Sequence, residues 1–273
     1  MQLKGRKALV TGAGRGIGRA IALALAAAGA QVALLARTRG QLEEVAAEIG
    51  GARSLVLSAD LAREAELRRA FGELAAVWGG VDILVNNAGV LGPIGPAHQV
   101  DPTAWLEAVR INLGGCFLCS QLVLPGMIAK GYGKIINLSG GGAVSPRPCF
   151  SAYSAAKAGV VRFTETLAAE VAPYHIDVNA VAPGAVNTRM LDQVLEAGRL
   201  AGDQALAEAR RQQEEGGTDP IRPAALVVYL ASPRSDGLSG RLFSAVWDDW
   251  QGLDVKQVMQ TEHYTVRRIV PPK

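Results

Sequence analysis

The sequence predicts an α/β fold: a single, doubly wound parallel sheet of about seven strands with helices on both faces. Two observations predict it. Short β-rich runs alternate with longer helical patterns almost from end to end of the 273 residues, which is typical of such domains. The β-rich runs are also nearly continuously apolar, as expected for strands buried on both faces. No long linker divides the chain, so residues 1–273 are expected to form a single domain with an atypical tail from about residue 247.

The elements follow from the chain in order. Helical patterns cover residues 41–49, 64–77, 105–127 and 152–171, and a more polar helical stretch covers 191–213. The last of these follows a strand end, where open α/β sheets usually bind ligands. The expected strands are KALVT (7–11), QVALLA (31–36), RSLVLS (53–58), VDILVNN (81–87), GKIINLS (133–139), IDVNAVA (176–182) and GRLFSAV (240–246).

Composition excludes several classes of function. The net charge is +3, and the 28 basic residues are scattered among 25 acidic ones, so we expect no nucleic-acid partner. Three cysteines make no disulfide framework, and the first residues contain no apolar signal core, which together favour a cytoplasmic location. The apolar residues 20–36 imitate a membrane span, but Gly29 and Gln31 interrupt them. They are better explained by a helix, a turn and a strand, so no membrane association is expected.

A glycine-rich turn joins the first strand to the first helix, with the sequence TGAGRGIG. Glycines let a backbone approach a pyrophosphate, and the free N–H groups at a helix N-terminus bind its charge. The TGxxxGxG spacing differs from the common G-x-G-x-x-G pattern, so simple packing of the strand against the helix remains the alternative. The cofactor-binding candidates in this turn are Gly12, Arg15, Gly16, Ile17 and Gly18.

The residue at the end of the second strand indicates which dinucleotide is bound. An NAD site would more often have an acidic residue here for the ribose hydroxyls, but this strand ends with Ala36 and Arg37. A guanidinium group suits a 2′-phosphate, and Arg15 is expected nearby. The sequence therefore favours NADP over NAD, the alternative being that both arginines are only solvated surface residues.

Tyr153 and Lys157 stand four residues apart in a predicted helix, so their side chains share one face. A neighbouring ammonium group stabilises a phenolate and lowers the pKa of the tyrosine toward working pH. Such a tyrosine can exchange a proton with a substrate oxygen. A chance pairing is the alternative, but the position after the fifth strand strengthens the functional interpretation.

Two other patterns suggest metal binding only weakly. Cys116 and Cys119 form a CxxC within an apolar helical run, without a second CxxC or a histidine cluster. We expect both to pack in the core instead of binding zinc or acting in redox chemistry. Asp248 and Asp249 are explained by an exposed turn after the last strand. No metal site is predicted.

Taken together, TGAGRGIG, Asp60-Leu61, NNAG at 86–89, Asn112, Tyr153-x-x-x-Lys157 and the PGxVxT pattern at 183–188 resemble the short-chain dehydrogenase/reductase family. The likeness spans about residues 5 to 246 and is closest to the shorter oxidoreductase branch, similar to 3-oxoacyl-carrier-protein reductases. It implies a Rossmann-type fold and hydride transfer between nicotinamide C4 and a carbonyl or secondary alcohol carbon.

The resemblance also implies residue roles. Tyr153 would be the acid/base, Lys157 would lower its pKa and hold the nicotinamide ribose, and Asn112 would support a water linking Lys157 to solvent. Asp60 and Leu61 would lie against the adenine. Further cofactor contacts are implied for Asn87, Ala88 and Gly89 along the cofactor, and for Pro183, Gly184, Val186 and Thr188 beside the nicotinamide amide.

The chain departs from the family pattern in two places. SAVWDDWQG and about two dozen further residues replace the usual V-D-G-G-like turn. The serine that usually lies thirteen residues before the tyrosine is Gly140 here, and Ser139 is one residue early. Adjacent strand side chains face opposite ways, so we expect a bulge made by the glycines at 140–142 to turn Ser139 into the site as a fourth catalytic residue. Alternatively, Ser139 only caps the strand end.

The sequence thus predicts an NADP-dependent oxidoreductase that acts on a small carbonyl compound or alcohol. Two alternatives remain: a catalytically weak dinucleotide-binding sensor or scaffold, and a structural subunit with a vestigial site. We expect a homodimer or homotetramer in which the apolar tail, with Trp247, Trp250, Tyr264 and residues 269–272, packs on a neighbouring subunit. A tail folded over its own domain is the alternative.

Overall fold

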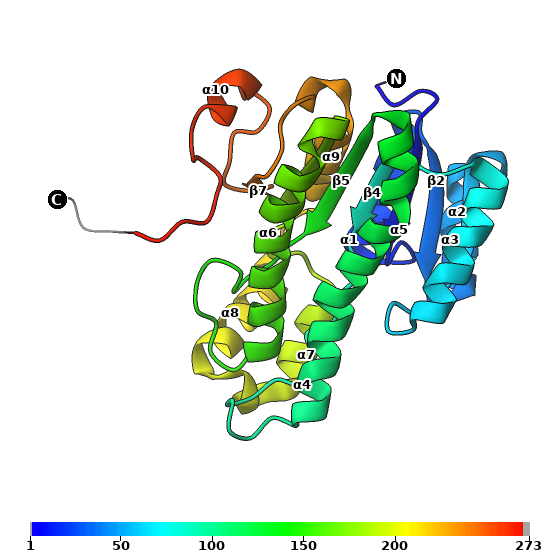
Figure 1. Cartoon of the computed structure of the whole chain (residues 1–273). Coiled ribbons are helices and arrows are strands. Elements are labelled where there is room, and N and C mark those ends of the chain that lie inside the picture. The colour runs from blue at the N-terminus through cyan, green and yellow to red at the C-terminus, as the bar shows by residue number, and fades with distance from the viewer. Residues whose placement is uncertain (1, 270–273) are drawn as a thin grey trace.

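The computed structural model describes residues 2–269 and confirms the expected fold class (Figure 1). All neighbouring strands pair in parallel in the order β3-β2-β1-β4-β5-β6-β7, so the order reverses between β1 and β4. The strands are β1 Lys7–Thr11, β2 Gln31–Ala36, β3 Ser54–Ser58, β4 Ile83–Asn86, β5 Gly133–Leu138, β6 Ile176–Ala182 and β7 Leu242–Ser244.

Both ends of β4 differ from the expected bounds where a side chain takes a backbone hydrogen bond. β4 starts after Asp82, whose carboxylate accepts the backbone N–H of Lys7 at 2.9 Å. It ends before Asn87, whose backbone N–H donates to the Thr11 hydroxyl at 3.0 Å. β7 is shorter than expected, and on its free edge the N–H of Leu242 donates to the carbonyl of Tyr264 in the tail, at 2.8 Å.

Helices cover both faces of the sheet. One apolar core cluster joins the sheet to α1, α2 and α9, and a second joins it to α3, α5 and α6. Helices α7 and α8 lie at the carboxyl ends of the strands, where Figure 1 shows them apart from the two covering layers. The bounds are α1 Gly16–Ala27, α2 Arg39–Ile49, α3 Glu64–Trp78, α6 Ser151–Val171, α7 Arg189–Ala197, α8 Asp203–Glu215 and α9 Ile221–Ala231.

The helical stretch Pro102–Lys130 is long and apolar enough by composition to cross a membrane, but it is a core helix. It consists of α4 (Pro102–Val109), a π-helical turn η2 (Arg110–Gly114) and α5 (Gly115–Lys130). The Asp101 carboxylate caps its start by accepting the N–H of Ala104 at 2.7 Å. On α5, Cys119 and Met127 are fully buried in the core cluster beneath the sheet. Residues 20–36, in contrast, are divided as expected between α1 and β2.

The tail after β7 folds over its own domain and includes α10 (Val255–Met259). Trp250 is only 9% exposed and its ring centroid lies 5.6 Å from that of Tyr229. Tyr264 packs on Phe243 of β7 with centroids 4.7 Å apart. For Trp250 the expectation of packing on a neighbouring subunit is therefore wrong, since α9 of its own chain buries it, and Tyr264 is partly buried by β7. Trp247 is 87% exposed and Ile269 is exposed, while residues 270–272 lie outside the described residues.

Candidate active site

The site is built where the strand order reverses, between the carboxyl ends of β1 and β4. The Thr11 hydroxyl accepts the backbone N–H groups of Asn87 and Ala88, each at 3.0 Å. The Asn87 amide group donates back to the Thr11 carbonyl at 2.9 Å. These bonds fix the two loops that leave the strands, and they keep open the crevice in which sheets of this kind bind ligands.

The glycine turn has the close packing that a dinucleotide site requires. A Cβ at Gly18 would lie 2.1 Å from the carbonyl oxygen of Gly12, so only glycine lets α1 begin against the turn. No side chain caps the N-terminus of α1, and Arg15 stands at the cap position. The first N–H groups of the helix are thus available to an anion. This donor set fits the diphosphate of a dinucleotide.

One cavity of about 720 Å³ joins the glycine turn to the tyrosine-lysine pair. It brings together most of the candidates from the sequence but leaves out Asn112, Gly184 and Val186, which lie near it without lining it. The predicted residues along its wall are Gly12, Arg15, Gly16, Ile17, Gly18, Arg37, Asp60, Leu61, Asn87, Ala88, Gly89, Ser139, Tyr153, Lys157, Pro183 and Thr188.

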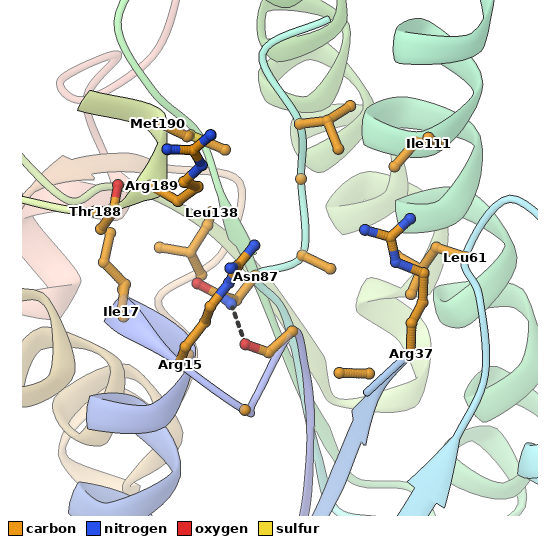
Figure 2. A pocket seen from close by; sticks show the side chains of 18 of the residues that line it. Arg15, Ile17, Arg37, Leu61, Asn87, Ile111, Leu138, Thr188, Arg189 and Met190 are labelled. Atoms are coloured by element: carbon orange, nitrogen blue, oxygen red, sulfur yellow. Dashed lines mark hydrogen bonds between the residues drawn. The ribbon is translucent and has the colours of Figure 1, made fainter. Parts of the chain in front are cut away.

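The two arginines predicted to bind phosphate both line the cavity, but they stand apart. Figure 2 shows Arg37 beside Leu61 and Arg15 on the side of Ile17. The Arg37 side chain is 66% exposed, and its guanidinium lies 4.0 Å from the Asp60 carboxylate. Arg37 thus lies at the Asp60-Leu61 end of the cavity, whereas Arg15 lies along another part of its wall, so the expectation that Arg15 stands near Arg37 is wrong.

Sequence reasoning missed several residues that line the cavity. Arg189 directly follows Thr188 and lies beside Met190 in Figure 2. Its guanidinium is paired with Glu196 at 2.6 Å. The sequence signal that could have identified Arg189 is its position directly after Thr188, a predicted cofactor contact. The apolar members carried no signal because they resemble core residues. The missed residues include Gln41, Val90, Ile111, Leu138, Arg189, Met190 and Gln193.

Lys157 and Tyr153 are both buried, on one face of α6. The Lys157 ammonium donates to the carbonyl of Leu138 at 2.7 Å, and burial lowers the pKa of Lys157 to about 8. Its Nζ lies 5.7 Å from the centroid of the Tyr153 ring. Burial raises the pKa of Tyr153, and the charge of Arg147 opposes this rise. The expected lowering by Lys157 is therefore not found, because removing the phenol from water outweighs the charges around it.

Asn112 lies in the π-helical turn between α4 and α5. Its amide group donates to the carbonyls of Val90 and Ala108, both at 2.8 Å, and its oxygen accepts the N–H of Val90 at 3.1 Å. π-Helical turns occur often at functional sites. Here the turn places the Asn112 side chain where it holds the loop that follows β4, and so it fixes one wall of the cavity.

Ser139 continues the regular pairing of β5, and its N–H donates to the carbonyl of Val181 at 2.8 Å. The expected bulge that would turn its side chain is therefore wrong: only Gly142 of the three glycines has a positive φ, at 89°. The side chain nevertheless lines the cavity without a bulge. It is 3% exposed, and its hydroxyl has no hydrogen-bond partner within the described residues.

The CxxC of Cys116 and Cys119 and the aspartates after β7 are explained by their structural contacts. Cys116 and Cys119 are buried free thiols, and burial raises the pKa of Cys116 to about 12. The Cys116 thiol donates to the Asn137 side-chain oxygen at 3.3 Å, which supports core packing. The Asp248 carboxylate accepts the N–H of Ser244 at 2.7 Å and so closes the turn after β7. Across residues 2–269, no group of three or more His, Cys, Asp or Glu side chains could hold a metal ion.

The parallel sheet, the glycine turn and the cavity at the strand reversal define a dinucleotide-binding protein of the Rossmann type. The sequence model described as short chain dehydrogenase matches residues 6–198, and the chain belongs to this family. It is thus an oxidoreductase of alcohol and carbonyl groups that uses a nicotinamide cofactor.

Individual relatives agree with this assignment. The chain is 38% identical over 193 residues to a 3-oxoacyl-acyl-carrier-protein reductase of Aquifex aeolicus, covering 70% of this chain and 77% of the relative. Among solved structures, a gluconate 5-dehydrogenase of Burkholderia cenocepacia in complex with NADP and tartrate superposes with a TM-score of 0.78 at 33% identity, covering 89% and 94% of the two chains. An NAD⁺-bound xylitol dehydrogenase gives 0.83 at 28% identity, covering 89% and 98%.

Proposed function

We propose that this protein is an NADP-dependent oxidoreductase that interconverts a carbonyl compound and a secondary alcohol, with Tyr153 as the acid/base. The observation that carries the proposal is the single cavity that extends from Arg37 and the glycine turn to Tyr153 and Lys157. When bound, the cofactor supplies or accepts the hydride at nicotinamide C4. The residues around it bind, orient and move the proton.

Proton transfer is assigned to four side chains. Burial raises the pKa of Tyr153, which keeps its phenol protonated at neutral pH and ready to donate to a carbonyl oxygen. Lys157 holds the ribose and supplies a nearby charge, which it retains below about pH 8. Asn112 positions the loop after β4 and supports the water that links Lys157 to solvent. Ser139, with its unpartnered hydroxyl, donates a hydrogen bond to the substrate oxygen.

Cofactor binding is assigned along the rest of the cavity. The uncapped start of α1, with Arg15 at its cap position, binds the diphosphate, and Arg37 binds the 2′-phosphate. Asp60 and Leu61 contact the adenine. The remaining contacts are assigned to Gly12, Gly16, Ile17, Gly18, Asn87, Ala88 and Gly89 along the cofactor, and to Pro183, Gly184, Val186 and Thr188 near the nicotinamide amide.

A second candidate is a catalytically weak dinucleotide sensor or scaffold. Two observations favour it: glycine stands at residue 140 where the family usually has its serine, and Lys157 donates to the Leu138 carbonyl. A protein of this kind would bind NADPH without turning over any carbonyl compound.

The test is NADPH oxidation by the pure protein with a panel of ketones and oxo acids. Tyr153→Phe should lower turnover by at least ~10²-fold, the usual effect of losing a general acid. Its affinity for NADPH should be kept. Tyr174→Phe is the matched control, because Tyr174 lies exposed after α6, outside the cavity lining. Near-normal turnover in Tyr153→Phe would contradict the mechanism, and tight NADPH binding without any turnover would favour the sensor.

Assembly as a homodimer or homotetramer is also proposed, in the cytoplasm. Phe117 is 48% exposed on α5 and packs edge-on against Phe163 of α6, with ring centroids 6.0 Å apart. Ile128 of α5 is exposed as well. A mixed face of two adjacent helices with exposed apolar side chains is suited to a second copy. Light scattering should give twice or four times the chain mass, and a monomer in Phe117→Glu. A monomeric wild type would contradict the proposal.

A further inference from the structure

Arg147 is a cation beside the candidate acid/base that the sequence did not single out. It lies in the loop between β5 and α6, six residues before Tyr153. Its charge lowers the pKa of Tyr153 against the effect of burial, which places the guanidinium within electrostatic reach of the phenol. Arg147 does not line the cavity that holds the cofactor residues. It approaches the glycine loop instead: a Cβ at Gly141 would lie 3.6 Å from one of its terminal nitrogens.

The guanidinium is held without a carboxylate. It stacks on the ring of Phe150 at 4.1 Å, and the residue is only partly exposed. Across residues 2–269, no Asp or Glu forms an ion pair with Arg147, and no hydrogen bond satisfies its side chain. A half-buried cation fixed by an aromatic ring but lacking a counter-ion has its donors free for an anion.

The glycine loop at 140–142 lies close to both the Tyr153 hydroxyl and the Arg147 guanidinium. A Cβ at Gly140 would lie 2.3 Å from the Tyr153 hydroxyl oxygen, and a Cβ at Gly141 would lie 3.6 Å from a terminal nitrogen of Arg147. Consecutive Cα atoms are about 3.8 Å apart. The phenol and the guanidinium thus each approach one of two consecutive positions of the same loop.

Apolar side chains complete this part of the molecule. Leu91, Phe150, Leu191 and Val194 are buried with Tyr153 in a separate cluster, to which Ile94 and Met190 add partly buried surface. The buried members pack against one another, and Met190, which also lines the cavity, offers partly exposed apolar surface to a substrate held at Tyr153.

We propose that Arg147 binds a carboxylate of the substrate, and that the substrates are short oxo acids and the corresponding hydroxy acids. The reacting oxygen would meet Tyr153, and the carboxylate would meet the guanidinium a few carbon atoms away. This inference rests on the proposed oxidoreductase function and names its substrate class.

The test compares each acid with its uncharged methyl ester. The panel consists of linear oxo acids with the carbonyl at carbon 2, 3, 4 or 5, for example acetoacetate and methyl acetoacetate. For the preferred acid, wild-type kcat/KM should exceed that of the ester by ~10-fold or more, since hydrogen bonds to charged groups typically contribute this much. Arg147→Met should remove this ratio, mainly through KM, and Arg147→Lys should restore part of it.

The quantity that decides the test is the ratio of kcat/KM for the acid to kcat/KM for its methyl ester. Loss of Arg147 also changes the pKa of Tyr153, which affects acid and ester alike, so only the ratio isolates contact with the carboxylate. Arg69→Met is the matched control, because Arg69 is exposed on α3, away from the cavity. It should keep the wild-type ratio.

A binding measurement adds a readout that does not need turnover. The NADPH complex is titrated with the matching hydroxy acids, such as 3-hydroxybutanoate, and the best-bound acid should lose ~10-fold in affinity in Arg147→Met. Equal affinities in the two proteins overturn the inference, as does a wild type that reduces esters as well as acids. If simple ketones are reduced but neither acids nor esters are, the inference fails alone; if ketones are not reduced either although NADPH binds, the proposed function itself fails.

Discussion

The side of Gly140 that would carry a side chain faces the Tyr153 hydroxyl: a Cβ there would lie 2.3 Å from the phenol oxygen and 3.1 Å from the ring carbon that bears it. Gly140 occupies the position at which the family usually has a serine. The phenol of this protein thus takes the space that a serine side chain would need. Tyr153 therefore occupies its position because residue 140 is a glycine and not that serine.

Gly140→Ser should lower activity instead of restoring a lost hydroxyl. The new side chain must displace Tyr153, and overpacking of this kind costs about 1–3 kcal/mol. Steady-state kinetics with thermal unfolding checks both effects. Gly72→Ser on α3 serves as the control, since a Cβ there meets no atom within 4 Å. A Gly140→Ser enzyme as active as wild type would show that Tyr153 and a serine can coexist.

Ser139→Ala should reduce turnover by ~10²- to 10³-fold, the typical effect of removing one donor to a reacting oxygen. Stability should hardly change, because the hydroxyl is buried without a partner. Ser154→Ala is a close control: the Ser154 hydroxyl is equally buried and unpartnered, but the residue does not line the cavity. NADPH affinity should be kept in both. If the two variants are equally active, Ser139 is only structural.

Arg37→Asp should abolish the preference for NADPH over NADH. The substitution removes a charge-assisted contact worth about 1.5–3 kcal/mol and places a carboxylate near the phosphate. Fluorescence titration with both cofactors measures the change. Arg39→Asp makes the same change of charge two residues later, outside the cavity lining, and should leave the preference intact. A wild type that binds NADH as tightly as NADPH refutes the assignment.

The buried ammonium of Lys157 should make stability depend on pH. Its pKa is about 8 in the folded protein against an ordinary 10.5, so the unfolded chain binds more protons between these values. The free energy of unfolding should therefore rise from pH 8 to 10.5. Below pH 8, Lys157→Met should gain up to about 3 kcal/mol relative to wild type, and this gain should shrink above pH 8. Denaturant titrations of both proteins from pH 7 to 10 test this; a constant difference would count against it.

The two tryptophans of the tail should differ sharply when replaced by alanine. Trp250→Ala should destabilise the protein by about 3 kcal/mol or more, because the ring is buried against Tyr229. Trp247→Ala should have little effect, since its side chain is almost fully exposed. Thermal unfolding of the two variants checks the contrast. Similar losses of stability would mean that Trp247 is buried in an assembly.

Much of the fold could be predicted because its signals are local. Apolar runs such as QVALLA matched their strands, and the ends of α3 and α6 fell within a residue of expectation. The misses at β4 came where a distant group intervened. Asp82 and Thr11 each take a backbone hydrogen bond that a strand would otherwise use, and no local pattern reveals a partner dozens of residues away.

The candidate site likewise has features that the local sequence determines and others that depend on the fold. Residue type and spacing determined by themselves the glycine turn, the Tyr153/Lys157 pair and the cation at Arg37, since each depends on a few consecutive residues. Only the tertiary structure decided that the tail covers its own sheet edge, that Ser139 lines the cavity without a bulge, that Arg147 lies beside Tyr153, and that burial dominates the pKa of the phenol. Those properties depend on solvent exclusion and on distances between separate elements, which the order of residues does not express.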